Sequence, residues 1–313
     1  MGWYIGGAIA LIFLIVFLSA LICFFIVFYS PKRKPLGMND YDIPAGGIYE
    51  PYRPQLEQWM REIRGMKRER VQVTSFDGLT LRGMYYEYAK DAPVELLFHG
   101  YRGNSERDLC GGVERCFALG RSVILIDQRG GGASDGSVTS FGIHERFDCL
   151  TWINYAVERF GSDVKLILGG VSMGGSTVAM AAGEDLPKNV VCVMSDCGYT
   201  SAKEIMYEVI QKMHLPPRLL YPFVRLGAKW FGRFDLEETS PLEAVKRSKT
   251  PIVFIHGDAD DFVPGRMSKE LYEACASPKK MVLIPGAGHG LSYPVDKEAY
   301  LNALRDFERE CGF

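Results

Sequence analysis

Near-continuous apolar runs recur along the chain from residue 94 to residue 284, and segments with helical periodicity separate them. Runs of this kind fit strands that are buried on both faces, as in a parallel sheet covered by helices. The alternation predicts an α/β fold with a mostly parallel central sheet. The expected strands are 94–98, 122–126, 164–168, 190–194, 251–255 and 280–284, and the expected helices are 105–119, 144–160, 174–184, 266–276 and 295–310.

Three other segments depart from this alternation of strands and helices. Residues 70–88 alternate around Asp77-Gly78, which predicts a β-hairpin. Residues 54–69 carry apolar side chains at three- and four-residue steps and a basic opposite side, so they form either a helix packed on the domain or one lying on an anionic membrane surface. Residues 198–248 interrupt the alternation with prolines, aromatic residues and basic residues, and we interpret them as a largely helical insertion.

The N-terminal segment has a different composition. Residues 2–30 contain no charged side chain, and a bilayer core of about 30 Å needs about 20 apolar residues as a helix. A signal peptide would have a basic start and a shorter apolar run, so a membrane anchor over residues 1–30 is the better interpretation. The basic cluster at 31–34 follows the span and predicts a single-pass protein with its C-terminal domain in the cytoplasm. Residues 31–53 are expected to be a linker, and 54–313 the folded domain.

Composition and cysteine spacing argue against nucleic acid and metal as partners. The net charge of −2 argues against general affinity for nucleic acid, and an apolar content of 47% supports a large core. None of the eight cysteines forms a C-x-x-C pair, and no Cys/His cluster has zinc-ligand spacing, so we expect no metal site. Free, buried thiols in a reducing compartment are the expected state of these cysteines.

The stretch GGVSMGGST follows the apolar run VKLIL and fits two overlapping motifs. Gly169, four residues and Gly174 imitate the start of a phosphate-binding loop, but Gly175 occupies the position of the required lysine. Gly170 to Gly174 also reads G-x-S-x-G, the strand-to-helix turn that presents a nucleophilic serine, Ser172.

A serine needs a base and an acid to become a nucleophile. Among five histidines, His289 lies in a glycine-rich loop after the last predicted strand and satisfies the chain order serine, acid, histidine. The expected acid lies in HGDADDFVP, at Asp258, Asp260 or Asp261, and Asp196 at another strand end is an alternative. The elbow geometry makes the backbone N–H of Met173 one donor to a developing oxyanion.

GVSMG, HGDADDFVP and GAGHG, in this order, resemble the α/β-hydrolase superfamily, and HGYRGN and DQRGGGASDG match as well. The resemblance covers about residues 70–313 and is closest to bacterial serine aminopeptidase- or prolyl oligopeptidase-like hydrolases. The family's Gly-x-x-Asp-x-x-Val pattern selects Asp260, with Asp261 as the fallback. The resemblance also implies that the N–H of Tyr101 is the second oxyanion donor and that 198–248 is a lid.

The expected function is therefore hydrolysis of a carboxylic ester or related acyl bond by Ser172, His289 and Asp260, without a metal or an organic cofactor. The expected substrate is a small, apolar ester or acyl compound. Two alternatives stay open: an aminopeptidase or amidase with the same triad, and a non-catalytic membrane-tethered scaffold. The lid residues that are candidates for lining the substrate pocket are Met206, Met213, Leu219, Leu220, Phe223 and Trp230.

Overall fold

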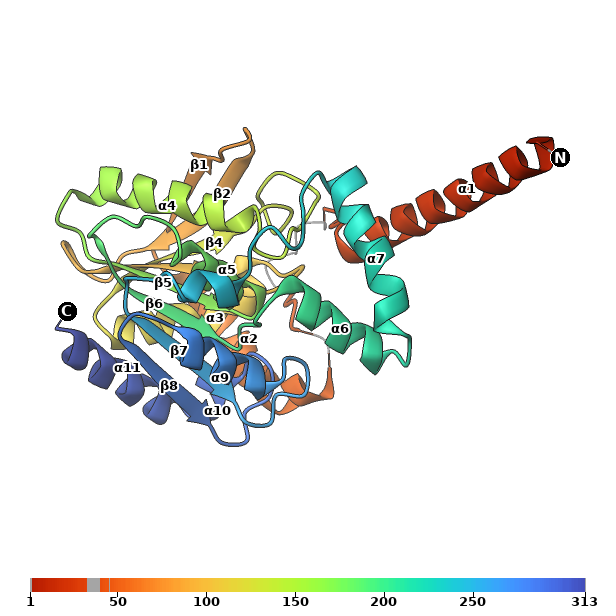
Figure 1. Ribbon diagram of the computed structural model, residues 1–313. Coiled ribbons are helices and arrows are strands. Elements are labelled where there is room, and N and C mark those ends of the chain that lie inside the picture. Colours follow the sequence, from red (N-terminus) through yellow and green to blue (C-terminus); the bar gives the residue numbers. More distant parts are fainter. Residues whose placement is uncertain (1, 33–39, 45, 313) are drawn as a thin grey trace.

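An eight-stranded sheet forms the centre of the molecule. The structure is a computed structural model that describes residues 2–32, 40–44 and 46–312. The strands lie in the order β1-β2-β4-β3-β5-β6-β7-β8, and only β2 runs antiparallel to its neighbours β1 and β4 (Figure 1). Their bounds are β1 Glu69–Thr74, β2 Thr80–Tyr86, β3 Val94–Phe98, β4 Ser122–Asp127, β5 Leu166–Val171, β6 Val190–Asp196, β7 Ile252–Gly257 and β8 Lys279–Ile284.

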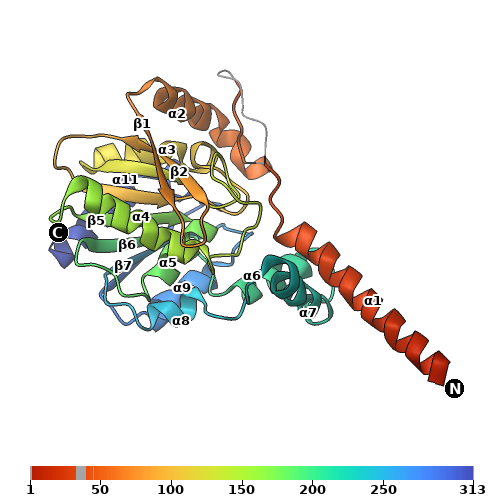
Figure 2. The same ribbon diagram turned by 90° about the horizontal axis from the view of Figure 1, so that it is seen from above.

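Helices cover both faces of this sheet and give three layers (Figure 2). One apolar cluster joins the sheet to helices on the first face, and a second cluster joins it to helices on the other face. Strands buried in this way explain why their sequences are continuous apolar runs. The first face carries α4 (Glu145–Phe160), α5 (Met173–Ala181), α8 (Pro241–Val245) and α9 (Gly265–Ala274), and the other carries α2 (Arg53–Gly65), α3 (Ser105–Ala118), α10 (Ser292–Val295) and α11 (Lys297–Cys311).

The predicted α/β fold is confirmed, with small differences in the elements. β5 runs on through Gly169 and Gly170 because both glycines pair in parallel register with the end of β3. The helix expected at 295–310 is divided at Asp296, whose carboxylate caps α11 by accepting the N–H of Ala299. The hairpin is present, but residues 75–79 form a longer connection than the two-residue turn expected at Asp77-Gly78. All eight cysteines are free, but only six are buried, because Cys23 and Cys311 lie at partly exposed positions near the ends of the N-terminal and C-terminal helices.

Helix α2 packs on the domain. Its apolar side is buried in the second cluster, and Arg64 on its other side pairs with Glu106 of α3 at 2.7 Å. Because this apolar side already faces the core, it is not available to insert into a membrane. The structure therefore favours the packed interpretation of residues 54–69. The buried apolar residues of α2 are Leu56, Trp59, Met60 and Ile63.

The insertion at 198–248 is largely helical. It contains α6 (Ala202–Lys212), α7 (Pro217–Gly227), a π-helical turn η2 (Ala228–Gly232) and α8. Pro217 starts α7, where a missing N–H costs nothing. In Figure 1, α6 and α7 project from the body, whereas α8 packs against α5. The projecting part of the lid is thus α6, α7 and η2.

Helix α1 (Gly2–Val27) extends away from the body, but its last turns pack against the body and the lid. Ala20, Phe24 and Phe28 are buried in contact with the lid, and a Cβ at Gly227 of α7 would lie 2.6 Å from the carbonyl oxygen of Ala20. Trp3–Val27 is long and apolar enough to cross a membrane, judged by length and composition. The segment expected to be a linker contains a 3-10 helix η1 (Gly47–Tyr52), while residues 33–39, including Arg33 and Lys34 of the basic cluster, and residue 45 lie outside the described residues.

Candidate active site

Ser172 occupies a sharp turn between β5 and α5. Its backbone has φ 57° and ψ −118°, a conformation that residues with side chains rarely adopt. The flanking glycines make the turn sterically feasible: a Cβ at Gly170 would lie 2.2 Å from the backbone of Gly174, and one at Gly174 would lie 2.1 Å from the carbonyl oxygen of Phe98. The residues of GGVSMGG thus leave room for a turn that holds the Ser172 side chain at the carboxyl edge of the sheet.

We expect Gly170→Ala to lower the free energy of unfolding by about 3 kcal/mol or more, because the new methyl group would overlap backbone that cannot move aside. Thermal or urea unfolding of the purified protein measures this change. Gly65→Ala at the end of α2 is the matched control, since nothing lies within 4 Å of that added Cβ. Equal stabilities of the two variants would contradict this account of the turn.

Three side chains from distant parts of the chain form one hydrogen-bonded series. Nε2 of His289 lies 2.9 Å from Oγ of Ser172, and Nδ1 of His289 lies 2.7 Å from Oδ2 of Asp260. His289 is on the loop after β8, and its backbone carbonyl accepts a hydrogen bond from the Tyr49 hydroxyl at 3.0 Å. The hydrogen bonds at both ring nitrogens fix the orientation of the imidazole between the serine and the carboxylate.

Asp260 is held by more than its contact with His289. Its Oδ1 accepts the backbone N–H groups of Phe262 and Val263, both at 2.9 Å, and its side chain is only 1% exposed. Burial alone would raise the pKa of this carboxyl, but hydrogen bonds from His256 and His289 outweigh burial and lower the pKa below its usual range. Asp260 is therefore ionised at neutral pH.

The other candidate acids lie elsewhere. Asp261 is exposed, and Asp258 accepts the N–H of Gly286. The buried carboxylate of Asp196 accepts hydroxyl hydrogen bonds from Ser292 and Tyr300. The structure thus brings Asp260, and none of the three alternatives, into hydrogen-bonding contact with His289.

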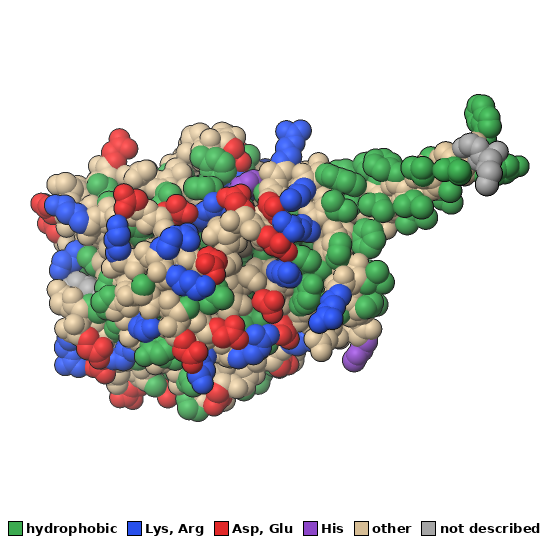
Figure 3. Space-filling model, viewed as in Figure 1, with side chains coloured by type: hydrophobic (Ala, Val, Ile, Leu, Met, Phe, Trp, Pro, Cys, Tyr) green, Lys and Arg blue, Asp and Glu red, His purple; other side chains and the backbone are tan. Residues whose placement is uncertain are grey.

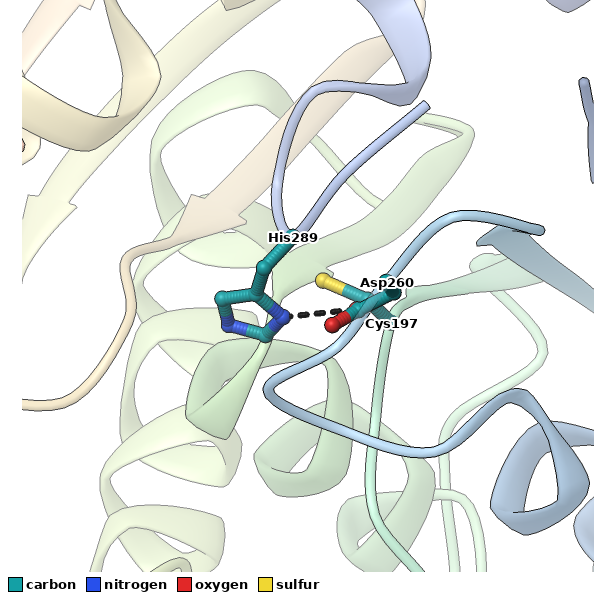
Figure 4. A group of neighbouring side chains, drawn as sticks. All are labelled: Cys197, Asp260 and His289. Carbon is teal, nitrogen blue, oxygen red and sulfur yellow. Dashed lines mark hydrogen bonds and ion pairs between the residues drawn. The ribbon is translucent and has the colours of Figure 1, made fainter. Parts of the chain in front are cut away.

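Cys197 lies beside this acid and base (Figure 4). Its sulfur and one ligand atom each from Asp260 and His289 lie within 4.8 Å of one another, a spacing that a metal ion can bridge. The chemistry of these donors does not fit a metal, because both ring nitrogens of His289 are already hydrogen-bonded. Burial also raises the pKa of the Cys197 thiol well above its usual value, so it stays protonated at neutral pH.

The two segments that carry the expected oxyanion donors, Met173 and Tyr101, both border Ser172. Met173 is the first residue of α5, directly after Ser172. The positive end of the helix dipole favours a negative charge close to its N–H. The loop after β3 passes close to the serine, since a Cβ at Gly100 would lie 3.6 Å from Cβ of Ser172. Asp108 accepts the N–H of Gly100 at 3.1 Å and so fixes the loop that carries Tyr101.

Two cavities meet at Ser172. The first, which we call the apolar cavity, has a volume of about 380 Å³ and lies between the body, the lid and the end of α1. The second, which we call the polar cavity because charged and hydroxyl side chains form part of its wall, has a volume of about 240 Å³ and is lined by His289, Tyr49, Arg107 and Asp108 as well as by apolar residues. The apolar cavity is lined by, among others, Cys23, Ile26, Val27, Phe141, Met206, Met213, Leu220 and Val224.

Only some of the candidate pocket residues line the apolar cavity. Met206, Met213 and Leu220 do so, whereas Leu219, Phe223 and Trp230 are absent from the described lining. The indole of Trp230 instead packs against the ring of Phe17 in α1, with centroids 6.3 Å apart. For Trp230 the reason is that α1 packs on one side of the lid, which the sequence pattern of the lid does not reveal. Leu219 is instead exposed to solvent.

Sequence reasoning missed several residues of this site. Tyr49 lies in a segment expected to be a linker, where the aromatic residues of GIYEPY were the available signal. Phe262 lines both cavities and packs against the His289 ring at 5.0 Å. Nothing in the apolar N-terminal run distinguishes the residues that line the cavity from those that face away.

An eight-stranded, mostly parallel sheet with a serine-bearing elbow after β5 is the architecture of the α/β-hydrolase class. The family model described as alpha/beta hydrolase fold matches residues 93–250, and the chain belongs to this family. The uncharacterized protein YqkD of Bacillus subtilis is 25% identical over 244 residues, which cover 77% of this chain and 79% of that protein. An uncharacterized membrane protein of Saccharomyces cerevisiae, YNL320W, is 28% identical over 200 residues, 62% of this chain and 63% of that protein.

Solved structures share this fold at low sequence identity. The Pyrococcus furiosus esterase Pf2001 has a TM-score of 0.64 and 19% identity, and the match covers 88% of this chain and 99% of that one. A Mycobacterium tuberculosis puromycin-hydrolyzing peptidase has a TM-score of 0.57 and 19% identity, with 79% of this chain and 39% of that one covered. At these identities the likeness concerns the fold.

Proposed function

We propose that the protein is a serine hydrolase that cleaves carboxylic esters. The observation that carries the proposal is the hydrogen-bonded series from Ser172 through His289 to Asp260 at the junction of two cavities. Nε2 of His289 takes the hydroxyl proton as Oγ of Ser172 attacks the carbonyl carbon. The tetrahedral intermediate collapses, His289 gives the proton to the departing alkoxide, and an acyl-serine remains. Water, deprotonated by His289, then releases the acid and restores Ser172.

The remaining groups stabilise charge during these steps. The ionised Asp260 holds the His289 tautomer that leaves Nε2 free to accept, and it stabilises the imidazolium that forms. The N–H groups of Met173 and Tyr101 are assigned as donors to the oxyanion, where each donor contributes about 3 kcal/mol to transition-state stabilisation.

The two cavities support an ester rather than a peptide. The apolar cavity suits an acyl chain and the polar cavity suits an alcohol, so the scissile bond lies at Ser172 between them. An aminopeptidase needs an acidic group for the substrate ammonium. The carboxylate in the polar cavity, Asp108, is already paired with Arg107 at 2.6 Å. An amidase with the same three residues is the second candidate, because one structural neighbour is a peptidase.

A substrate series tests this preference. We expect p-nitrophenyl esters with medium or long acyl chains to give a kcat/KM at least about 100-fold above that of aminoacyl p-nitroanilides, because the apolar cavity binds each added methylene favourably. Full-length protein in detergent or vesicles is assayed with both series. A higher kcat/KM for the anilides would move the assignment to an amidase.

We further propose that α1 anchors the protein as a single pass, with the hydrolase domain in the cytoplasm. The length and apolarity of Trp3–Val27, the basic cluster at 31–34 and the yeast relative named as a membrane protein support this placement. Protease treatment of intact cells is expected to leave the domain uncut, and treatment after permeabilisation to degrade it. Digestion from outside the intact cell would place the domain on the other side.

A further inference from the structure

The last turns of α1 form part of the wall of the apolar cavity. Cys23, Ile26 and Val27 line it together with Ser172, although they precede the serine by about 150 residues in sequence. The same turns are buried against the lid through Phe24. The segment that has the composition of a membrane anchor is thus also a structural part of the cavity beside the candidate nucleophile.

Two residues of the loop after β3, Tyr101 and Arg102, hold the end of α1 in place. The Tyr101 hydroxyl donates to the carbonyl of Val27 at 2.6 Å, and Nη2 of Arg102 donates to the carbonyls of Ile26 and Tyr29 at 2.8 and 2.6 Å. The last carbonyls of a helix have no partner within the helix, and they attract a cation. The contacts at the end of α1 therefore connect the helix directly to the loop next to Ser172.

The depth of the lid along α1 follows from its contacts. Trp230 packs against Phe13 and Phe17 with ring centroids 6.4 and 6.3 Å apart. At 1.5 Å per residue, Phe13 lies about 21 Å along the axis from Val27, and only about 17 Å of helix precedes it. Since a bilayer core is about 30 Å thick, an α1 that spans the core carries the Trp230 edge of the lid into the hydrocarbon core.

The surface of the lid fits this position. Apolar side chains continue from α1 onto the adjoining part of the body (Figure 3). Two cations near this edge, Arg225 and Lys229, are both paired with Asp235, at 3.0 and 2.8 Å, which reduces the cost of placing them near lipid. The large apolar side chains that the lid leaves exposed include Met213 (60%), Leu215 (43%), Leu219 (63%) and Trp230 (43%).

We propose that the apolar cavity receives its acyl chain directly from the bilayer, between α1 and α6 of the lid, which both line it, and that the substrate is a membrane-resident, long-chain acyl ester of a polar alcohol. The acyl chain lies against Cys23 and Ile26 of α1, and the polar alcohol lies in the polar cavity beside Tyr49 and Arg107. The proposal rests on ester hydrolysis at Ser172. Helix α1 then has two roles, as the anchor and as part of the acyl-binding wall.

A variant that narrows the cavity from the α1 side tests the wall. Ile26→Trp in the full-length protein is expected to lower the ratio of kcat/KM for palmitoyl over butyryl esters by about tenfold or more, because a bulky ring takes the space of the longer chain. Leu18→Trp is the matched control, since Leu18 is on the same helix, is 45% exposed and is outside the described lining of the cavity. This control is expected to keep the wild-type ratio.

The outcomes separate this inference from the proposed function. If Ile26→Trp keeps both wild-type esterase activity and the wild-type palmitoyl-to-butyryl ratio, α1 is not part of the acyl-binding wall. The proposed hydrolase function is unaffected by that result. A wild-type protein that cleaves neither ester and does not react with a fluorophosphonate probe refutes the hydrolase itself. If the Tm of Ile26→Trp is far below that of wild type, Ile26→Ala replaces it. This smaller side chain is expected to shift the ratio toward the longer ester.

Tryptophan fluorescence tests the depth of the lid without any substrate. In a Trp3→Phe protein, Trp59 and Trp152 are buried at 2% and 0% exposure, so Trp230 is the exposed indole that remains. In phosphatidylcholine vesicles with bromines on the acyl chains, Trp230 is expected to be quenched. Adding Trp230→Phe is expected to remove most of the quenching. Equal quenching with and without Trp230 would overturn the placement of this edge of the lid in the hydrocarbon core.

Discussion

Ser172→Ala is expected to lower kcat for ester hydrolysis by about a millionfold and to abolish labelling by a fluorophosphonate probe. The reason is chemical: the hydroxyl 2.9 Å from His289 is the group assigned to attack the carbonyl, and alanine offers no atom in its place. Turnover of a short p-nitrophenyl ester and in-gel detection of the bound probe measure the two effects on the same purified protein.

Ser176→Ala provides the matched control for this prediction. Ser176 lies one turn further along α5, fully buried, and its hydroxyl accepts the N–H of Tyr199 at 2.8 Å. Its loss is expected to cost about 1–3 kcal/mol of stability while probe labelling persists. Labelling that survives in Ser172→Ala, or that disappears in Ser176→Ala at a temperature where the variant is folded, would refute Ser172 as the nucleophile.

Asp260→Asn is expected to lower kcat by about 10⁴-fold with little change in KM. Asparagine keeps the shape of the side chain, and its amide oxygen can still accept the N–H groups of Phe262 and Val263. It removes the negative charge that stabilises the His289 imidazolium and permits the wrong tautomer of the ring. Steady-state kinetics on a soluble ester measure both constants.

The neighbouring residue gives the control for this assignment. Asp261→Asn changes the same functional group one position away, on an exposed side chain, and is expected to leave kcat within about twofold. If Asp261→Asn instead caused the large loss, the acid would have been assigned to the wrong residue of the pair.

The lowered pKa of Asp260 also predicts how stability depends on pH. A carboxyl whose pKa is lower in the folded than in the unfolded state contributes stability above its unfolded pKa of about 4, and this contribution is lost as pH falls through the folded value. Asp260→Asn is therefore expected to be less stable than wild type at neutral pH, with a difference that shrinks below about pH 4. Urea unfolding of both proteins from pH 7 to pH 3 measures this trend, and a gap that widens in acid would contradict it.

Much of the candidate site follows from short segments of sequence. GGVSMGG specifies the turn at Ser172 because its steric demands involve residues within a few positions and the ends of adjacent strands. The order of HGDADDFVP and GAGHG along the chain places an acid and a histidine after β7 and β8. The choice among the aspartates depended on a family pattern, because the residues alone left three of them open. The structure adds the local reason: Oδ1 of Asp260 accepts the N–H groups two and three residues ahead, which turns Oδ2 toward His289.

The sequence by itself determined the α/β fold, the elbow at Ser172 and the apolar character of the N-terminal helix, because each is expressed in local periodicity or in a motif of a few residues. Only the tertiary structure decided which side chains enclose the cavities. Tyr101 and Val27 meet across 74 positions, and Tyr49 reaches His289 across 240. Such contacts depend on how the packed layers bring distant segments together. For this reason α1 had the composition of an anchor in the sequence, and its place beside Ser172 became visible only in the fold.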